Sequence, residues 1–277
     1  MQQRTGIAPI QNHVMQPVVQ TQARGAGLAV IVSCVLVATA WPADAAGCLF
    51  ESQGEGRVAA VIDARSFRLQ DGREVRLAGI EPIASTKADR AAALSAAIAG
   101  RDVTLHGDDD SPDRYGRQPA FVYLAGSETP VQSILLAQGD ALVSADVTDK
   151  DCAGILNAAE AEARRAKRGF WADPAAIKNA ESPGDILAGI GRFNVVEGRV
   201  LSVRQAGATT YLNFGRNWTR DFAVTISRRA AAAFEAAGIG LKSLENRRIR
   251  VRGWVEARGG PRIELLRVGQ IEMLGGN

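Results

Sequence analysis

The sequence predicts a mainly β protein with helices (α+β), built as two small five-stranded β-barrels in tandem. Runs that alternate apolar and polar residues cluster in two regions of the 277-residue chain, alanine-rich helical segments accompany both clusters, and a stretch rich in proline and glycine separates them. At roughly 150 residues per domain, the length also favours two domains. We therefore expect a first domain at 46–173, a linker at 174–192 and a second domain at 193–277.

The first region is predicted to be a barrel with three helices. Strands at 56–62, 66–69 and 74–77 form a meander, because Asp71-Gly72 before the third strand is typical of a hairpin turn. The later segments are strands at 103–105 and 120–124 and helices at 88–98, 131–138 and 153–168. Gly100 and Gly169 follow two of these helices, as glycine commonly does at helix ends.

The second region has the same general order of three strands, a helix and two strands. The predicted strands are 195–203, 211–214, 222–226, 248–255 and 262–266, and the helix is 228–237. The tetrapeptide Glu-Gly-Arg-Val occurs at 55–58 and again at 197–200, in the first predicted strand of each region. Each region therefore resembles a small oligonucleotide-binding (OB) barrel.

The N-terminal 45 residues have the pattern of an export signal. Arg24 precedes an apolar run at 26–40, and Ala43 and Ala45 form a small-x-small cleavage site. The run is shorter than the roughly 20 residues that a bilayer span needs. We expect cleavage, a periplasmic or secreted protein, and no stable membrane span afterwards; an uncleaved anchor, a lipid attached at Cys48 and a start at Met15 are the alternatives.

Cleavage would leave two cysteines, Cys48 and Cys152, in a compartment that permits disulfides. We expect them to pair, closing a loop of about a hundred residues and contributing on the order of 4 kcal/mol. Two buried free thiols are the alternative.

The composition limits the chemistry that the chain can perform. With two histidines and three cysteines, a histidine-rich metal site or a zinc ribbon is excluded, and a net charge of +3 is too small for a chain that coats nucleic acid along its whole length. Any catalysis must depend on carboxylates and arginines.

Several motifs in the first region occur together in one known family. They are Val75-Arg76-Leu77-Ala78-Gly79-Ile80, Asp113-Arg114-Tyr115-Gly116-Arg117, Ala120-Phe121-Val122-Tyr123 and the segment 159–171. In this order and spacing they resemble the staphylococcal nuclease (thermonuclease) family over about residues 56–173. The resemblance implies a barrel whose active members hold one Ca²⁺ on carboxylates, activate water with a carboxylate and clamp the scissile phosphate with two arginines.

The resemblance assigns roles to individual residues. Arg76 and Arg117 match the two clamp arginines, and Asp63 and Glu81 match remnants of the acidic set. Arg65 stands at a metal-ligand position and Ala84 at the position of the water-activating glutamate. A cation in place of a ligand disfavours Ca²⁺, so we expect no cofactor, with Ca²⁺ only if the site is rebuilt from other residues; Asp108-Asp109-Asp110 is the candidate, and a solvated loop is the favoured alternative.

Charge is divided unevenly between the two regions. Residues 46–192 contain 17 basic and 22 acidic residues (net −5), and residues 193–277 contain 14 and 7 (net +7). The predicted nucleic-acid-binding set is Arg248, Arg250 and Arg252 on one face of a strand, Arg262 on the adjoining strand, and Trp218 in the arginine- and aromatic-rich stretch 211–222. Alternatively, these arginines dock against the acidic first domain, and Tyr211, Phe214 and Phe222 belong to the core.

Two functional hypotheses follow from the sequence. The first is an exported, catalytically degenerate member of the nuclease family that binds single-stranded DNA or RNA, or an envelope protein, without cutting. The second is an exported phosphodiesterase with atypical metal use that retains Arg76, Arg117, Asp63 and Glu81. Arg65 and Ala84 are the residues that separate the two, and they leave enzymatic activity an open question.

Overall fold

The computed structural model describes residue 48 and residues 50–83, 87–108 and 111–275. The predicted signal at 1–45, Ala84, Asp109 and Asp110 lie outside the described residues. None of the described helices is long and apolar enough to cross a membrane.

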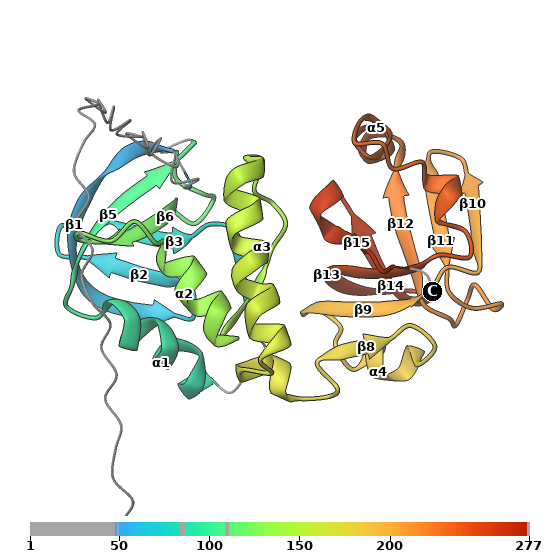
Figure 1. Cartoon of the computed structure of the whole chain (residues 1–277), viewed down its shortest axis with the longest axis horizontal. Helices are drawn as coiled ribbons and strands as arrows, with labels where there is room; N and C mark the ends of the chain where they lie inside the picture. The colour runs from blue at the N-terminus through green and yellow to red at the C-terminus, as the bar shows by residue number, and fades with distance from the viewer. Residues whose placement is uncertain (1–47, 49, 84–86, 109–110, 276–277) are drawn as a thin grey trace, which may run out of the picture. The chain divides into compact units, whose positions relative to one another are not determined.

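Five strands of the first region close into a barrel, as the sequence predicts. They are β1 (Glu51–Asp63), β2 (Ser66–Leu69), β3 (Glu74–Leu77), β5 (Asp102–Gly107) and β6 (Gln118–Leu124), in the order β1-β2-β3-β6-β5 (Figure 1). The β3–β6 pair is parallel and the other pairs are antiparallel. The long β1 can serve two neighbours, because residues 51–57 pair with β5 and residues 58–63 pair with β2.

Helices cover one side of this barrel and complete its core. They are α1 (Lys87–Ile98), α2 (Val131–Gln138) and α3 (Lys150–Arg165), followed by the 3₁₀ turn η1 (Gly169–Ala172). Leu94, Leu136 and Leu156, one from each helix, are fully buried in the same cluster as the barrel residues Phe67 and Leu77. The short strands β4 (Ile80–Pro82) and β7 (Ala141–Val143) pair with each other.

The expected disulfide is present and ties the start of the described chain to α3. Cys48 and Cys152 are bonded, with their Cα atoms 4.4 Å apart and a sequence separation of 104. Asp149 caps α3 by accepting a hydrogen bond from the backbone N–H of Cys152 at 2.7 Å, so the bonded cysteine lies in a well-formed first turn.

The second region forms a sheet of eight strands, three more than predicted. Its path is β10 (Ser202–Ala206), β11 (Thr209–Asn213), β12 (Ala223–Ser227), β14 (Gly260–Leu265), β13 (Arg248–Arg258), β9 (Phe193–Arg199) and β8 (Ile177–Asn179), with β15 (Ile271–Met273) also on β13. The predicted strand 195–203 is divided into β9 and β10. The sheet also gains β8 and β15, whose three residues are too few to show an alternating pattern. Helix α5 (Arg228–Ala236) and the 3₁₀ turns η2 (Leu241–Leu244) and η3 (Val268–Gln270) complete the region.

The two regions share one strand order. If β9 and β10 together take the place of β1, the second sheet repeats the order of the first barrel, including the parallel pair, here β12–β14. The change of partner occurs at the repeated tetrapeptide, where Val58 and Val200 donate equivalent backbone hydrogen bonds to Arg101 (2.9 Å) and Arg247 (3.0 Å). A side chain at Gly198 would come within 2.4 Å of the Ala180 Cβ, so this close packing requires glycine.

Residues 174–192, expected as a linker, contain β8 and the short helix α4 (Pro183–Leu187). A separate apolar cluster joins Leu142, Ala163 and Trp171 to Ala176 and Val195, so residues of both regions share it. The segment is therefore packed structure rather than a loose connection.

Candidate functional site

The two predicted clamp arginines converge on one carboxylate. Arg76 lies on β3 and Arg117 directly precedes β6, and the parallel β3–β6 pairing brings them to the same part of the barrel. Asp113 Oδ2 accepts hydrogen bonds from Arg117 Nε (3.0 Å) and Nη2 (2.8 Å), and Arg76 Nε lies 3.7 Å from the same oxygen. The two arginines are thus joined through Asp113.

The turn at 113–117 is built around this carboxylate. Asp113 Oδ1 accepts from the backbone N–H groups of Tyr115 (2.9 Å) and Arg117 (3.1 Å), and Gly116 takes the left-handed conformation (φ 76°) that closes the turn. Burial acts to raise the pKa of Asp113, but the hydrogen bonds from Arg117 and Tyr115 outweigh it and lower the pKa to about 2. Asp113 is therefore a carboxylate at neutral pH.

Tyr115 lies exposed beside these arginines. Its side chain is 65% exposed, with the guanidinium carbons of Arg114 and Arg117 at 4.8 and 5.1 Å from the ring centroid. An exposed ring between cations is a surface on which a flat, electron-rich group can stack while a neighbouring phosphate is held.

At the expected metal position, Arg65 forms an ion pair with Glu81. Arg65 Nη1 lies 2.6 Å from Glu81 Oε2, and Asp63 Oδ1 accepts a hydrogen bond from the backbone N–H of Arg65 at 2.9 Å. Burial raises the pKa of Glu81, and the positive charge of Arg65 opposes the rise without cancelling it. Both remnant acidic residues are thus engaged by Arg65.

These residues do not fit a Ca²⁺ ion. Ca²⁺ takes six to eight oxygen ligands, whereas the oxygen of Glu81 faces a guanidinium and the carboxylate of Asp63 supports a turn. No group of three or more histidine, cysteine, aspartate or glutamate side chains with metal-binding geometry occurs among the described residues. The position of the expected water-activating residue, Ala84, lies outside them.

Two of the predicted nucleic-acid-binding arginines are engaged inside the protein. Arg252 is buried and forms a two-pronged ion pair with Glu160 of α3 at 2.8 and 2.9 Å. Arg250 is only 11% exposed and bridges Glu197 (2.9 Å) and Glu272 (2.8 Å). The prediction that these two face a nucleic acid is wrong, because Arg252 is buried against Glu160 of α3 and Arg250 is held between glutamates of the neighbouring strands β9 and β15. For Arg252, the alternative of docking against the first region is the one observed.

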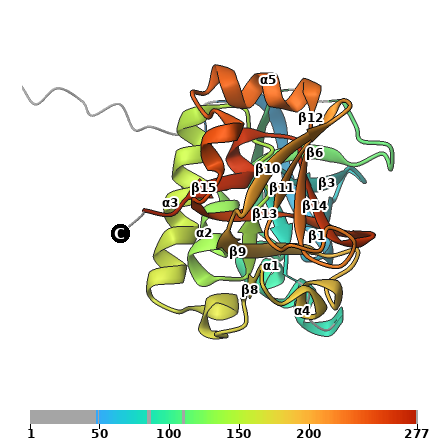
Figure 2. The same ribbon diagram turned by 90° about the vertical axis from the view of Figure 1, so that its right-hand side faces the viewer.

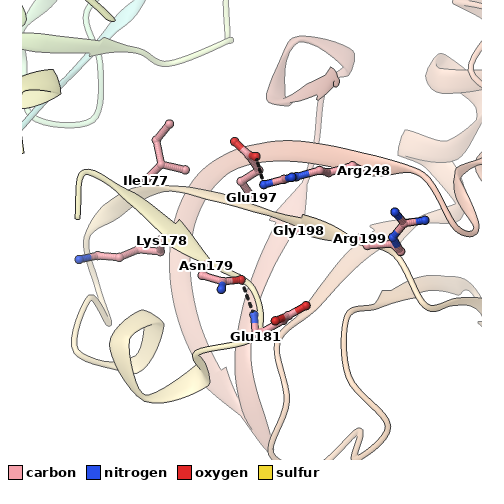
Figure 3. Close-up of a pocket in the computed structure, with 8 residues that line it drawn as sticks. All are labelled: Ile177, Lys178, Asn179, Glu181, Glu197, Gly198, Arg199 and Arg248. Atoms are coloured by element: carbon pink, nitrogen blue, oxygen red, sulfur yellow. Dashed lines mark hydrogen bonds and ion pairs between the residues drawn. The ribbon is translucent and has the colours of Figure 1, made fainter. Parts of the chain in front are cut away.

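Arg248, the third arginine of that strand, lies at a different hollow. Its side chain is 64% exposed and pairs with Glu197 at 2.7 Å (Figure 3). The hollow of about 410 Å³ that it lines also contains Glu181, so acidic and basic groups share the surface there.

Arg262 and Trp218 lie together at a third place. Both line a hollow of about 720 Å³ that also contains Arg204, Tyr211 and Arg216. The arginine- and aromatic-rich stretch 211–222 includes Arg216, so the sequence indicated that residue as part of a binding surface. Arg204 was missed, although the outward position of Arg204 on an alternating strand is a signal that could have identified it. Phe214 and Phe222 are buried in the core, as the alternative interpretation expected.

A comparison with protein families identifies the first region. Residues 75–173 match a family model described as staphylococcal nuclease homologue, and the match includes Arg76, Glu81 and Arg117. A comparison with curated proteins found no match. The matched segment contains β3 to η1 of the closed barrel and its helices. The chain therefore carries a staphylococcal nuclease homologue domain over residues 75–173.

Proposed function

We propose that the protein is an exported, non-cleaving nucleic-acid-binding member of the nuclease fold. The observation that carries the proposal is the Arg65–Glu81 ion pair at 2.6 Å, in which a side chain with a fixed positive charge takes up the carboxylate that would hold a cation. Arginine remains charged at any physiological pH, so this occupant cannot be removed by deprotonation.

Electrostatics makes this substitution unfavourable for a metal. A −1 ligand replaced by a +1 side chain changes the local charge by two units beside the place of a dication. Two unit charges of the same sign about 4 Å apart repel by about 4 kcal/mol at the effective dielectric near a protein surface. The repulsion doubles when one of the two charges is a dication. An affinity typical of a single Ca²⁺ site would be lost.

The phosphate clamp retains positive charge but has a competitor. Asp113 neutralises one of the two charges of Arg76 and Arg117, and its low pKa keeps it ionised. A phosphodiester must displace or share Asp113, so we expect weak binding at this place. The second region, with its excess of basic residues, supplies most of the affinity in this proposal.

The test is a cleavage and binding assay on the full chain. Single-stranded DNA and RNA are incubated with Ca²⁺, Mg²⁺ or Mn²⁺ and with chelator, and binding is measured in parallel by fluorescence anisotropy. We expect salt-dependent binding without metal-dependent strand scission. Ca²⁺-dependent scission that disappears in Arg117→Ala but persists in Arg101→Ala, which changes an exposed arginine outside this cluster, would overturn the non-cleaving part of the proposal.

An exported phosphodiesterase with atypical metal use is the second candidate. Its support is the retained juxtaposition of Arg76 and Arg117 at one carboxylate. The same assay separates the two candidates, because this one requires scission with Mg²⁺ or Mn²⁺ where Ca²⁺ is inactive.

Export belongs to the proposal as well. The Cys48–Cys152 disulfide supports it, because such bonds persist in the periplasm or outside the cell and are rare in a reducing cytosol. Mass determination of the protein recovered from a periplasmic fraction, with and without thiol alkylation, tests both the bond and cleavage near Ala45. If the full chain binds no oligonucleotide, an envelope protein becomes the proposed partner.

A further inference from the structure

We propose that the hollow lined by Arg204, Tyr211, Arg216, Trp218 and Arg262 is a binding site for single-stranded nucleic acid. The inference rests on the proposed function and specifies where on the chain the nucleic acid is held. The hollow has a volume of about 720 Å³ and lies over β10, β11, β14 and the loop 214–222. Figure 2 turns these strands toward the viewer.

Strand alternation builds the floor of this site. Val203, Leu212 and Ile263 are buried in the core, so the side chains next to them in sequence point outward. Arg204 is directly opposite Tyr211 in the β10–β11 pairing, and the guanidinium carbon of Arg262 lies 5.5 Å from the Tyr211 ring centroid. The three outward residues therefore form a cation–aromatic–cation row across the sheet.

A loop held by internal hydrogen bonds supplies the other side of the hollow. Phe214 and Phe222 are buried with their ring centroids 5.0 Å apart, which fixes both ends of the loop. Within it, Asp221 Oδ2 accepts from the backbone N–H of Asn217 at 2.8 Å, and Asn217 O accepts from the backbone N–H of Asp221 at 2.8 Å. Trp218, at the tip, is nevertheless 76% exposed. The loop thus presents a large apolar ring to solvent at a defined place.

The charge of the hollow is not compensated by its own residues. Three arginines line it, and its lining contains no acidic side chain. Among the residues that the structure describes, neither Arg204 nor Arg216 lies within 4 Å of a carboxylate oxygen; the positive charge of Arg204 acts at longer range and contributes to lowering the pKa of Glu245, which does not line the hollow. This differs from Arg248, Arg250 and Arg252, each of which has a glutamate partner.

These features together favour a single strand over other polyanions. Guanidinium groups provide phosphate contacts, and an exposed indole provides a stacking surface for a base. In a duplex the base faces are covered by their neighbours, and a polyanion without bases has nothing to stack on the ring. Single-stranded DNA and RNA satisfy both parts of the site.

The experiment measures binding of a fluorescein-labelled dT₁₂ oligonucleotide to the full chain at several salt concentrations. In the test variant, Arg204→Gln is combined with Arg216→Gln. The matched control combines Arg228→Gln with Arg229→Gln, two exposed residues of α5 that lie outside the hollow and lower the net charge by the same amount. Circular dichroism verifies that each variant is folded.

We expect the test variant to reduce the log–log salt slope by about 1.4, because a single strand contributes about 0.7 for each phosphate neutralised. If the test variant and the wild-type chain have equal affinities at 1 M salt, this difference in slope corresponds to roughly 60-fold weaker binding of the test variant at 50 mM salt. The control variant should keep the wild-type slope. Trp218→Phe should lose most of the oligonucleotide-induced quenching of tryptophan fluorescence, and Trp218→Ala should weaken binding about 5- to 150-fold, the range for one base stacked on an aromatic ring.

The outcomes separate this inference from the proposed function. If the wild-type chain binds dT₁₂ but the test variant behaves like the control, the site is elsewhere and only this inference fails. If the wild-type chain binds no oligonucleotide at low salt, the proposed function fails with it. If heparin binds with equal affinity and dT₁₂ causes no quenching that depends on Trp218, the hollow is a general polyanion site and the assignment to nucleic acid is overturned.

Discussion

Replacing Arg252 with methionine removes one half of the buried ion pair between the two regions. Methionine has a comparable length and keeps the apolar packing of the side chain, but it takes away two hydrogen bonds to Glu160, at 2.8 and 2.9 Å, and the positive charge. Glu160, whose side chain is 3% exposed, would then keep only the hydrogen bond from the backbone N–H of Val143 at 2.7 Å. We expect the free energy of unfolding to fall by about 3–5 kcal/mol, the usual cost of leaving one buried partner unpaired.

The measurement is urea denaturation followed by fluorescence, with two comparison variants. Arg248→Met removes an exposed ion pair and should cost less than about 1 kcal/mol. Glu160→Gln added to Arg252→Met should recover most of the loss, because glutamine can still accept from Val143 and carries no charge to bury. A cost below about 1 kcal/mol for Arg252→Met alone would show that water reaches Glu160 and that the two regions are not locked by this pair.

Further predictions concern the disulfide and the nuclease-like site. Cys48→Ser with Cys152→Ser should lower the free energy of unfolding by about 4–5 kcal/mol, since a loop of 104 residues is no longer closed; an unchanged urea midpoint would refute this. Asp113 has its pKa lowered from 3.8 to about 2, so its contribution to stability is present above pH 3.8 and is lost as the pH falls toward 2; Asp113→Asn should flatten this part of the stability–pH curve, and an unaltered curve would contradict the assignment. Glu81 has a raised pKa, so it contributes stability below pH 4.5 that is lost as the pH rises through the folded-state value; Glu81→Gln should remove that decline in the same titration. Arg65→Asp with Ala84→Glu should produce Ca²⁺ affinity measurable by calorimetry, and the absence of binding heat would count against Arg65 as the blocking residue.

Local patterns were sufficient for the barrel and its disulfide. Alternation along 66–69 predicted β2 and the apolar run 120–124 predicted β6, with the boundaries within two residues, and two remaining cysteines left one pairing. The sequence did not predict the short strands β8 and β15. Their three residues are too few to show an alternating pattern, and they acquire their structure from pairing with β9 and β13. The linker expected at 174–192 was misjudged for the same reason.

Whether an arginine side chain is free to contact a ligand was the property that the sequence predicted least well. Alternation correctly places Arg250 and Arg252 on one face of β13, but it contains no information on what covers that face. The glutamates that pair with these arginines, Glu160 and Glu272, are 92 and 22 positions away in sequence from their respective partners, and only the folded chain brings them there. The surroundings of Arg65 were easier to predict, because its position in the motif placed it beside Glu81, and the structure pairs the two residues.

Helix α3 is attached to the rest of the protein by a disulfide in its first turn and by ion pairs nearer its C-terminus. Cys152 in its first turn is bonded covalently to Cys48, whereas Glu160 and Arg164, two and three turns later, attach it to Arg252 and Glu272 of the second region. A thiol reductant acts on the first attachment and leaves the second intact, because neither the buried ion pair of Arg252 with Glu160 nor the apolar cluster around Ala163 and Val195 contains a reducible bond. Reduction of the disulfide can therefore release the anchoring of the N-terminal segment while the two regions stay joined.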